Sequence, residues 1–139
     1  MVFMVTDRKT IRLLILEDSQ NEAERIVSLF RNAGHATRVH RITSLDDLND
    51  ALKSTWDLCI AAHDSKNLAP LSALQTIQRT ARDISFIQLI EDNSAELRIE
   101  MLELGAQDAV PRNEDELLVL VAKRELANLE ERRERRSAE

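Results

Sequence analysis

Two adjacent acids, Glu17 and Asp18, are the residues whose type and spacing best suit chemistry. They follow the apolar run Ile11–Leu16 and precede a segment with helical spacing. Paired carboxylates at such a point can hold a hard cation such as Mg²⁺, which prefers oxygen ligands. Acid-rich turns between a strand and a helix also arise because acids cap helix N-termini. The pair by itself leaves both interpretations open.

Other reactive residue types offer less. The single cysteine, Cys59, lies in the apolar run 58–62, where a small buried hydrophobe is expected. His63 and Asp64 follow this run and are interpreted as a solvated loop at a strand end. Two glycines in the whole chain exclude glycine-rich phosphate-binding loops of the Walker and dinucleotide types. We expect no cofactor.

Composition limits the class of protein. A chain of 139 residues has the length of one domain, and no apolar run approaches the length of about 18 residues that spans a bilayer. The net charge of -6 argues against general nucleic-acid affinity, so neither nucleic acid nor membrane is an expected partner. Arginines at positions 132, 133, 135 and 136 alternate with glutamates, which is typical of a solvated helix surface. The apolar first residues lack the features of a secretory signal, so we expect a cytoplasmic protein.

The elements that must position the acids alternate in type. Five apolar runs, at 11–16, 36–42, 56–62, 84–90 and 106–110, are each followed by a segment with the period of a helix. Three runs are almost continuously apolar, as strands covered on both faces are. The pattern predicts an α/β doubly wound sheet of five parallel strands, in which sites form at the carboxyl ends of the strands.

The first helix is indicated by a stripe of Ala23, Ile26, Val27 and Phe30, with Gly34 where a left-handed cap is wanted. Ser44 and Ser94 are predicted N-caps. The inner face of the second helix is predicted from Leu48, Ala51 and Leu52. A third helix is marked by Leu71, Leu74, Ile77 and Ala81, and a fourth carries Leu97, Met101, Leu102 and Leu104 and stops at Gly105.

Three segments together resemble the receiver (CheY-like) domain of two-component response regulators. They are 11–19, which ends in Leu-Glu-Asp-Ser; 56–60, Trp-Asp-Leu-Cys-Ile; and 104–112, Leu-Gly-Ala-Gln-Asp-Ala-Val-Pro-Arg. The last is similar to the Gly-Ala-x-Asp-Tyr-x-x-Lys segment that receivers carry at their fifth strand. The match runs in order from about Ile11 to Ala127 and implies the flavodoxin-like receiver fold.

The resemblance also implies roles by position. In receivers an acidic pair binds Mg²⁺, an aspartate ending the third strand accepts a phosphoryl group, a Thr or Ser ends the fourth strand and a Lys ends the fifth. Here Glu17 and Asp18 supply the pair, but the acceptor position is Ala62, the hydroxyl position is Ile90 and the lysine position is Arg112. Loss of this set implies a pseudo-receiver that is not phosphorylated, in which the remaining pair binds Mg²⁺ weakly.

One alternative keeps a working acceptor. Asp64 lies two residues beyond Ala62, so on a continuing strand it would face the same way, displaced by about 6.6 Å. A bulge at His63 would bring it back toward the pair. The domain would then be a phosphorylatable receiver that uses Asp64.

Helix-compatible sequence from Glu114 past Arg136 is roughly twice the usual length of the last receiver helix. Val119, Ala122, Leu126 and Leu129 follow the 3-4-3 spacing of a coiled-coil seam, which predicts a homodimer or a signalling helix that leads to a downstream domain. The alternative is a long last helix whose tip is solvated. We expect a tail at 1–10, a receiver-like domain at 11–124 and a helical extension or linker at 125–139.

Among receivers without an acceptor, the sequence looks most like the N-terminal domain of FimX-type bacterial proteins, which also carry degenerate GGDEF and EAL domains. That resemblance implies a role in cyclic-di-GMP signalling, type IV pilus assembly and twitching motility, and a place at a cell pole. Neither a GGDEF nor an EAL stretch occurs in this chain. We therefore expect a non-enzymatic module that binds partners, dimerises or directs localisation.

Overall fold

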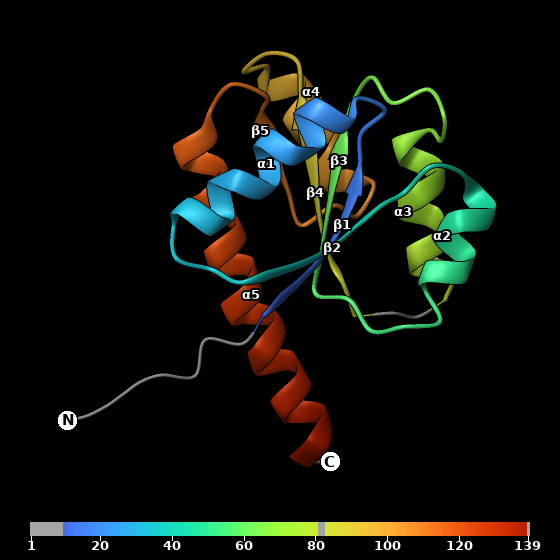
Figure 1. The fold of residues 1–139 in the computed structure, drawn as a ribbon, viewed down its shortest axis with the longest axis vertical. Coiled ribbons are helices and arrows are strands. Elements are labelled where there is room, and N and C mark those ends of the chain that lie inside the picture. Colours follow the sequence, from blue (N-terminus) through green and yellow to red (C-terminus); the bar gives the residue numbers. More distant parts are fainter. Residues whose placement is uncertain (1–9, 81–82, 139) are drawn as a thin grey trace.

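The computed structural model describes residues 10–80 and 83–138. Strands and helices alternate along the chain as β1 (Ile11–Leu16), α1 (Gln20–Asn32), β2 (Thr37–Arg41), α2 (Leu45–Ala51), β3 (Leu58–Ala62), α3 (Pro70–Arg79), β4 (Ser85–Ile90), α4 (Ala95–Glu103), β5 (Asp108–Pro111) and α5 (Asp115–Ala138). All strand pairs are parallel, in the order β2-β1-β3-β4-β5 (Figure 1). The predicted five-stranded, doubly wound α/β fold is confirmed.

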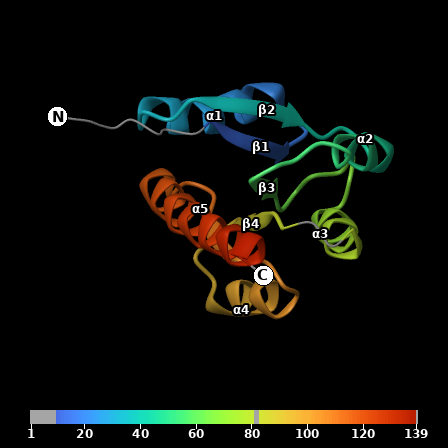
Figure 2. The same ribbon diagram turned by 90° about the horizontal axis from the view of Figure 1, so that it is seen from below.

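Helices cover both faces of the sheet. On one face α1 and α5 pack on the apolar side chains that alternate strand positions direct toward them, such as Leu13, Ile15 and Ile60. On the other face α2 and α3 pack on Leu14, Leu16 and their neighbours. The two pairs of helices lie on opposite sides when the sheet is viewed from below (Figure 2). Burial on both faces explains the almost continuous apolar runs of the central strands.

The helix ends follow the sequence signals. Ser19, Ser44 and Ser94 are N-caps, and the hydroxyl of each accepts a hydrogen bond from the backbone N–H three residues on. Gly34 adopts φ 92° and Gly105 adopts φ 106°, the left-handed conformation that closes the ends of α1 and α4. The predicted N-caps Ser44 and Ser94 and the predicted helix ends at Gly34 and Gly105 are therefore confirmed, and Ser19 is a further N-cap.

The third and fourth helices form where the sequence predicts them, but only some of their apolar residues are buried. In α3 the buried residues are Ala73, Leu74, Thr76 and Ile77, whereas Leu71 is exposed and Ala81 lies outside the described residues. In α4 no residue is buried, and Leu97, Leu102 and Leu104 are exposed. The apolar spacing correctly predicted that α4 is a helix. It could not predict whether the apolar side chains are buried, because the spacing is the same whether or not another element covers them.

The predicted long last helix is confirmed as α5, but its predicted seam is not an open surface. Ala122 and Leu129 are buried in their own chain, with Leu126 packed partly against the same core, so the 3-4-3 spacing marks the side of α5 that faces the sheet. Of the predicted seam only Val119 and Leu126 keep partial exposure. Nor is the arginine cluster simply solvated, because Arg132 and Arg133 donate hydrogen bonds to other parts of the chain. None of the described helices is long and apolar enough to cross a membrane.

Candidate functional site

Four strand ends meet at the carboxyl edge of the sheet. Glu17 follows β1, Ala62 ends β3, Ile90 ends β4 and Arg112 follows β5. The strand order reverses between β1 and β3, which is the position at which doubly wound sheets form their sites. The fold thus brings the residues predicted from the sequence to one edge.

Arg112 bridges two carboxylates at this edge. Its Nη2 donates to Oε1 of Glu17 at 2.9 Å, and its Nη1 donates to Oδ2 of Asp64 at 3.1 Å. The side chain of Glu17 is only 5% exposed, whereas that of Asp64 is 53% exposed. Asp64 lies beyond the end of β3, and no strand bulge carries it. Glu17, Arg112 and Asp64 form a set that we call the arginine bridge.

The charges of the arginine bridge support one another. Burial disfavours the charge on Arg112, but the hydrogen bond with Asp64 and the charges of Asp64 and Glu17 outweigh it, so the pKa of Arg112 is raised. Burial likewise opposes the charge on Asp64, but the hydrogen bond and charge of Arg112 hold the pKa of this carboxyl below its usual value. A guanidinium is planar and can donate to two carboxylates at once, which a lysine ammonium does with less directional control.

Asp18 makes its side-chain hydrogen bonds with the loop that follows β3. Its carboxylate accepts hydrogen bonds from the hydroxyl of Ser65 at 3.2 Å and from the backbone N–H of Lys66 at 2.7 Å and of Asn67 at 3.4 Å. Arg41 donates to the backbone carbonyls of Glu17 and Asp18. Asp18 therefore holds the loop between β3 and α3, a role that adjacent acids in a sequence do not reveal.

The acceptor and hydroxyl positions are apolar and closed. Ala62 is 2% exposed and Ile90 is 3% exposed. Between their strands the amide of Gln88 donates to the carbonyls of Ala61 and Leu89. Ala62 offers no oxygen to bind a cation, and Ile90 offers no hydroxyl to bond a phosphoryl group.

The donor set does not fit the Mg²⁺ ion that receivers bind. Glu17 is paired with Arg112 and also accepts from the backbone N–H of Ser19, and Asp18 is bonded to the β3–α3 loop. A cation at this point would have to displace a guanidinium that already carries the compensating charge. Within residues 10–80 and 83–138 no group of three or more His, Cys, Asp or Glu side chains could hold a metal ion.

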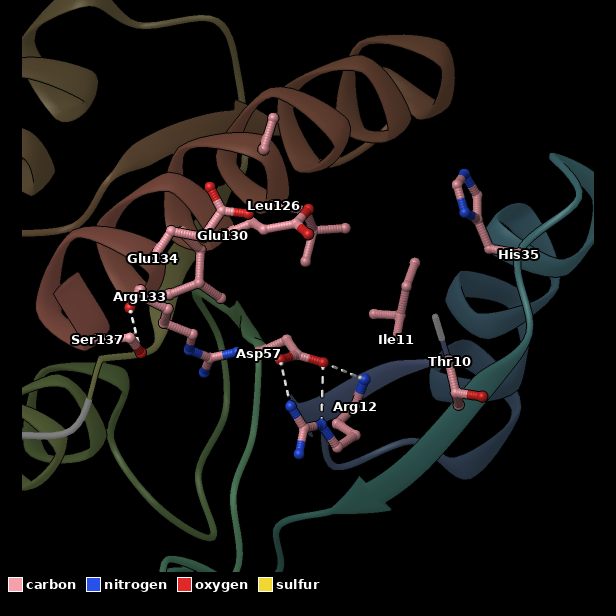
Figure 3. A pocket seen from close by; sticks show the side chains of 12 residues that line it. Thr10, Ile11, Arg12, His35, Asp57, Leu126, Glu130, Arg133, Glu134 and Ser137 are labelled. Atoms are coloured by element: carbon pink, nitrogen blue, oxygen red, sulfur yellow. Dashed lines mark hydrogen bonds and ion pairs between the residues drawn. The ribbon is translucent and has the colours of Figure 1, made fainter. Parts of the chain in front are cut away.

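The opposite, amino edge of the sheet carries a second charged cluster that the sequence did not predict. Asp57, which is 7% exposed, accepts from the backbone N–H and the guanidinium of Arg12, and Arg133 of α5 donates to the same carboxylate at 2.6 Å. Arg133 also donates to the backbone carbonyls of Trp56 and Asp83. These residues lie beside a groove of about 1070 Å³ between α5 and the start of β1 (Figure 3). We call the set of Arg12, Asp57 and Arg133 the α5 clamp.

Burial disfavours the charge on Asp57, but the hydrogen bonds from Arg12 and Arg133 outweigh it and hold the pKa of this carboxyl below its usual value. Sequence spacing gave no signal of the α5 clamp, because 76 residues separate Asp57 from Arg133. The alternation of arginine and glutamate near the end of α5 looks the same whether an arginine is solvated or bonded.

No family model matches the sequence, and no curated protein matches it. Solved structures do match. A receiver domain of Francisella response regulator 1452 aligns over 86% of this chain and 98% of its own, with a TM-score of 0.73 and 19% identity. A CheY-like receiver protein of Methanospirillum hungatei JF-1 aligns over 89% of this chain and 99% of its own, with a TM-score of 0.73 and 15% identity. The chain has the receiver-domain fold.

A longer relative of this fold is NtrX of Brucella abortus, which aligns over 94% of this chain but only 30% of its own, with a TM-score of 0.77 and 18% identity. In NtrX the receiver fold therefore occurs within a longer chain. At these identities the likeness concerns the fold, so the chemistry of the site must be argued from this chain's own residues.

Proposed function

We propose that this chain is a receiver-fold module that does not accept a phosphoryl group and serves as a non-enzymatic interaction part of a larger signalling protein. The observation that carries the proposal is the arginine bridge. Arg112 already gives Glu17 a positive partner, the charge that Mg²⁺ would supply in a receiver.

Phosphoryl transfer depends on positioning and charge neutralisation, with little covalent chemistry to be supplied by the protein. In this chain Ala62 has no nucleophile and Ile90 has no hydroxyl, while Glu17 and Arg112 neutralise each other. The arrangement stabilises one conformation of the carboxyl edge. This arrangement favours a module that keeps one conformation over a switch that phosphorylation drives.

The proposal includes a downstream domain and a homodimer. Residues 11–124 form the receiver-like unit and 125–139 the helical extension, although the α5 clamp fixes the extension to the sheet as far as Arg133. A contact between two copies through α5 would use its exposed side chains Leu117 and Leu120, since Ala122 and Leu129 are buried in their own chain. Light scattering of the wild type and of Leu120→Ser tests the dimer. A wild type that is monomeric at high micromolar concentration would contradict the proposed homodimer.

The resemblance to FimX-type proteins supports the finer assignment to cyclic-di-GMP signalling, type IV pilus assembly and twitching motility, in the cytoplasm and at a cell pole. No nucleic acid and no membrane belong to the proposed partners. The test of this part is whether deletion of the encoding gene in its native host abolishes twitching and whether a fluorescent fusion gathers at a pole.

One observation favours a second candidate. Asp64 is exposed and bonded to the cation at the lysine position, as a phosphoacceptor at this edge could be. Incubation with Mg²⁺ and acetyl phosphate followed by intact mass measurement separates the two candidates. We expect no phosphoryl addition, whereas an addition to the wild type that Asp64→Ala lacks would establish the phosphorylatable receiver. A working receiver treated in parallel is the positive control.

A further inference from the structure

A groove of about 310 Å³ lies between α3 and α4, next to the carboxyl edge of the sheet. Its walls are mainly apolar side chains: Leu71 and Leu74 of α3, Leu97, Met101 and Leu104 of α4, and Ile90 at the end of β4. We call it the α3–α4 groove. It is distinct from the arginine bridge, because neither Glu17 nor Arg112 lines it.

The exposed apolar surface of α4 is fixed in place. The amide of Gln78 on α3 donates to the carbonyl of Leu104, and Arg98 on α4 pairs with the buried Asp108 of β5 at 3.0 Å. Burial disfavours the charge on Asp108, but hydrogen bonds that include those from Arg124 and Arg98 outweigh it and keep its pKa low, so this anchor is charged at neutral pH. The groove is therefore a formed feature between two anchored helices.

Ile90 stands at the position where receivers carry a Thr or Ser, and it also lines the α3–α4 groove. The Thr or Ser that the resemblance to receivers implies here would carry a polar hydroxyl, whereas Ile90 is 3% exposed and extends the apolar wall of the groove. The residue that offers no hydroxyl to a phosphoryl group thus adds apolar surface to the groove. Apolar clefts with a polar rim are typical of binding sites.

The rim of the groove is acidic. Glu96, Glu100 and Glu103 follow one another on α4 at helical spacing, and this row runs beside the row of Leu97, Met101 and Leu104. Glu100 lines the groove itself, as does Glu91, whose carboxylate lies 2.8 Å from Nε2 of His63, and no lysine or arginine is among the described residues that line the groove. A partner that complements this surface would place apolar side chains in the groove and cations along its edge.

A second copy of the chain fits less well than a different protein. The chain's own basic cluster on α5 is already engaged, since Arg132 and Arg136 pair with Asp83 and Arg133 pairs with Asp57. An amphipathic helix is the segment that offers apolar residues at i and i+4 together with charges beside them, and it can lie in a groove between two helices.

We propose that the α3–α4 groove docks a cationic amphipathic helix of a partner protein. This inference rests on the proposed function, because it identifies the surface that an interaction module would use. The partner's apolar side chains insert between Leu71 and Leu97, and its lysines or arginines face Glu100 and its neighbours on α4.

The test uses a displayed library of random helical peptides of about 15 residues, a length at which isolated helices become stable. After selection on the whole chain, the tightest peptide is made synthetically and its affinity is measured for three variants. Leu97→Ser changes a groove residue, Glu100→Lys reverses one rim charge, and Ile99→Ser is the matched control. Ile99 is a more exposed apolar residue of the same helix that does not line the groove.

We expect the selected peptides to share apolar residues at i and i+4 with flanking Lys or Arg. Leu97→Ser should weaken binding by about tenfold or more, as for a central contact, and Ile99→Ser by less than about twofold. Glu100→Lys should weaken binding and reduce its salt dependence. Circular dichroism checks that each variant folds, which their exposed positions favour.

Failure to select any peptide would overturn the inference, as would selection of peptides without basic residues. An affinity that falls equally for Leu97→Ser and Ile99→Ser would do the same. A dimer in light scattering that Leu97→Ser dissociates would make a second copy the occupant. None of these results depends on acetyl phosphate treatment, so the inference and the proposed function can fail separately.

Discussion

Arg133 of α5 lies 2.6 Å from the carboxylate of Asp57 through its Nη1 atom, and its Nη2 donates to the carbonyls of Trp56 and Asp83. A single side chain near the end of α5 thus binds the segments that lead into β3 and β4. The last turns of α5 are therefore part of the folded domain as far as Arg133, which joins them to the amino edge of the sheet.

The α5 clamp makes a first prediction. Arg133→Ala should lower the free energy of unfolding by about 2 kcal/mol, because it leaves two backbone carbonyls and part of Asp57 without their donor. Urea denaturation measures the change. The matched control is Arg135→Ala, whose exposed pair with Glu131 should contribute less than about 0.5 kcal/mol. Equal effects of the two variants would show that the clamp does not form.

Asp57 makes the stability depend on pH. Its pKa is held below the unfolded value of about 3.9, so its stabilisation is complete above that value and is lost as pH falls through the lower, folded pKa. Asp57→Asn should therefore cost about 2 kcal/mol at neutral pH, and the difference from the wild type should shrink at about pH 3. Urea unfolding at the two pH values tests this, and a difference that grows toward acid would contradict it.

The arginine bridge makes a third prediction. Arg112→Ala leaves the buried Glu17 without its cation and should lower the free energy of unfolding by about 3 kcal/mol. Asp64→Ala removes an exposed partner and should cost less than about 1 kcal/mol. Thermal and urea unfolding of both variants measure the contrast. If Asp64→Ala is as damaging as Arg112→Ala, the effect of Arg112 comes from its pair with Asp64 and not from its pair with Glu17.

Cys59 should be chemically silent in the folded chain. Burial raises the pKa of its thiol to about 12, and the reactive thiolate is therefore scarce at neutral pH. A thiol reagent should modify it only as fast as the protein unfolds, with full reaction in denaturant. Rapid modification of the native protein would show that β3 is accessible.

The sequence predicted the fold because its signals are local. Runs such as Ile11–Leu16 mark buried strands, and Ser94 and Gly105 mark the two ends of α4. It also located Glu17, Ala62, Ile90 and Arg112 at one edge, since parallel strands bring their carboxyl ends together. The α/β class and the residues at the strand ends could therefore be predicted without knowing any side-chain contact.

The side-chain partners could not be predicted in this way. Arg112 is 95 residues from Glu17 and 48 from Asp64, and spacing along the chain does not say which carboxylate a guanidinium meets. Leu129 and Leu97 have the same apolar character, yet Leu129 is buried and Leu97 is exposed. Burial depends on which elements cover a helix, and periodicity does not contain that information.

The central claim is that Arg112 supplies the positive charge beside Glu17 that a receiver takes from Mg²⁺. The most direct measurement is the melting temperature of the wild type with and without millimolar Mg²⁺, because an ion that binds the folded state raises it. We predict no change, with Glu17→Gln as the control variant. A rise with Mg²⁺ that Glu17→Gln abolishes would show that the carboxyl edge binds the ion and would contradict the account.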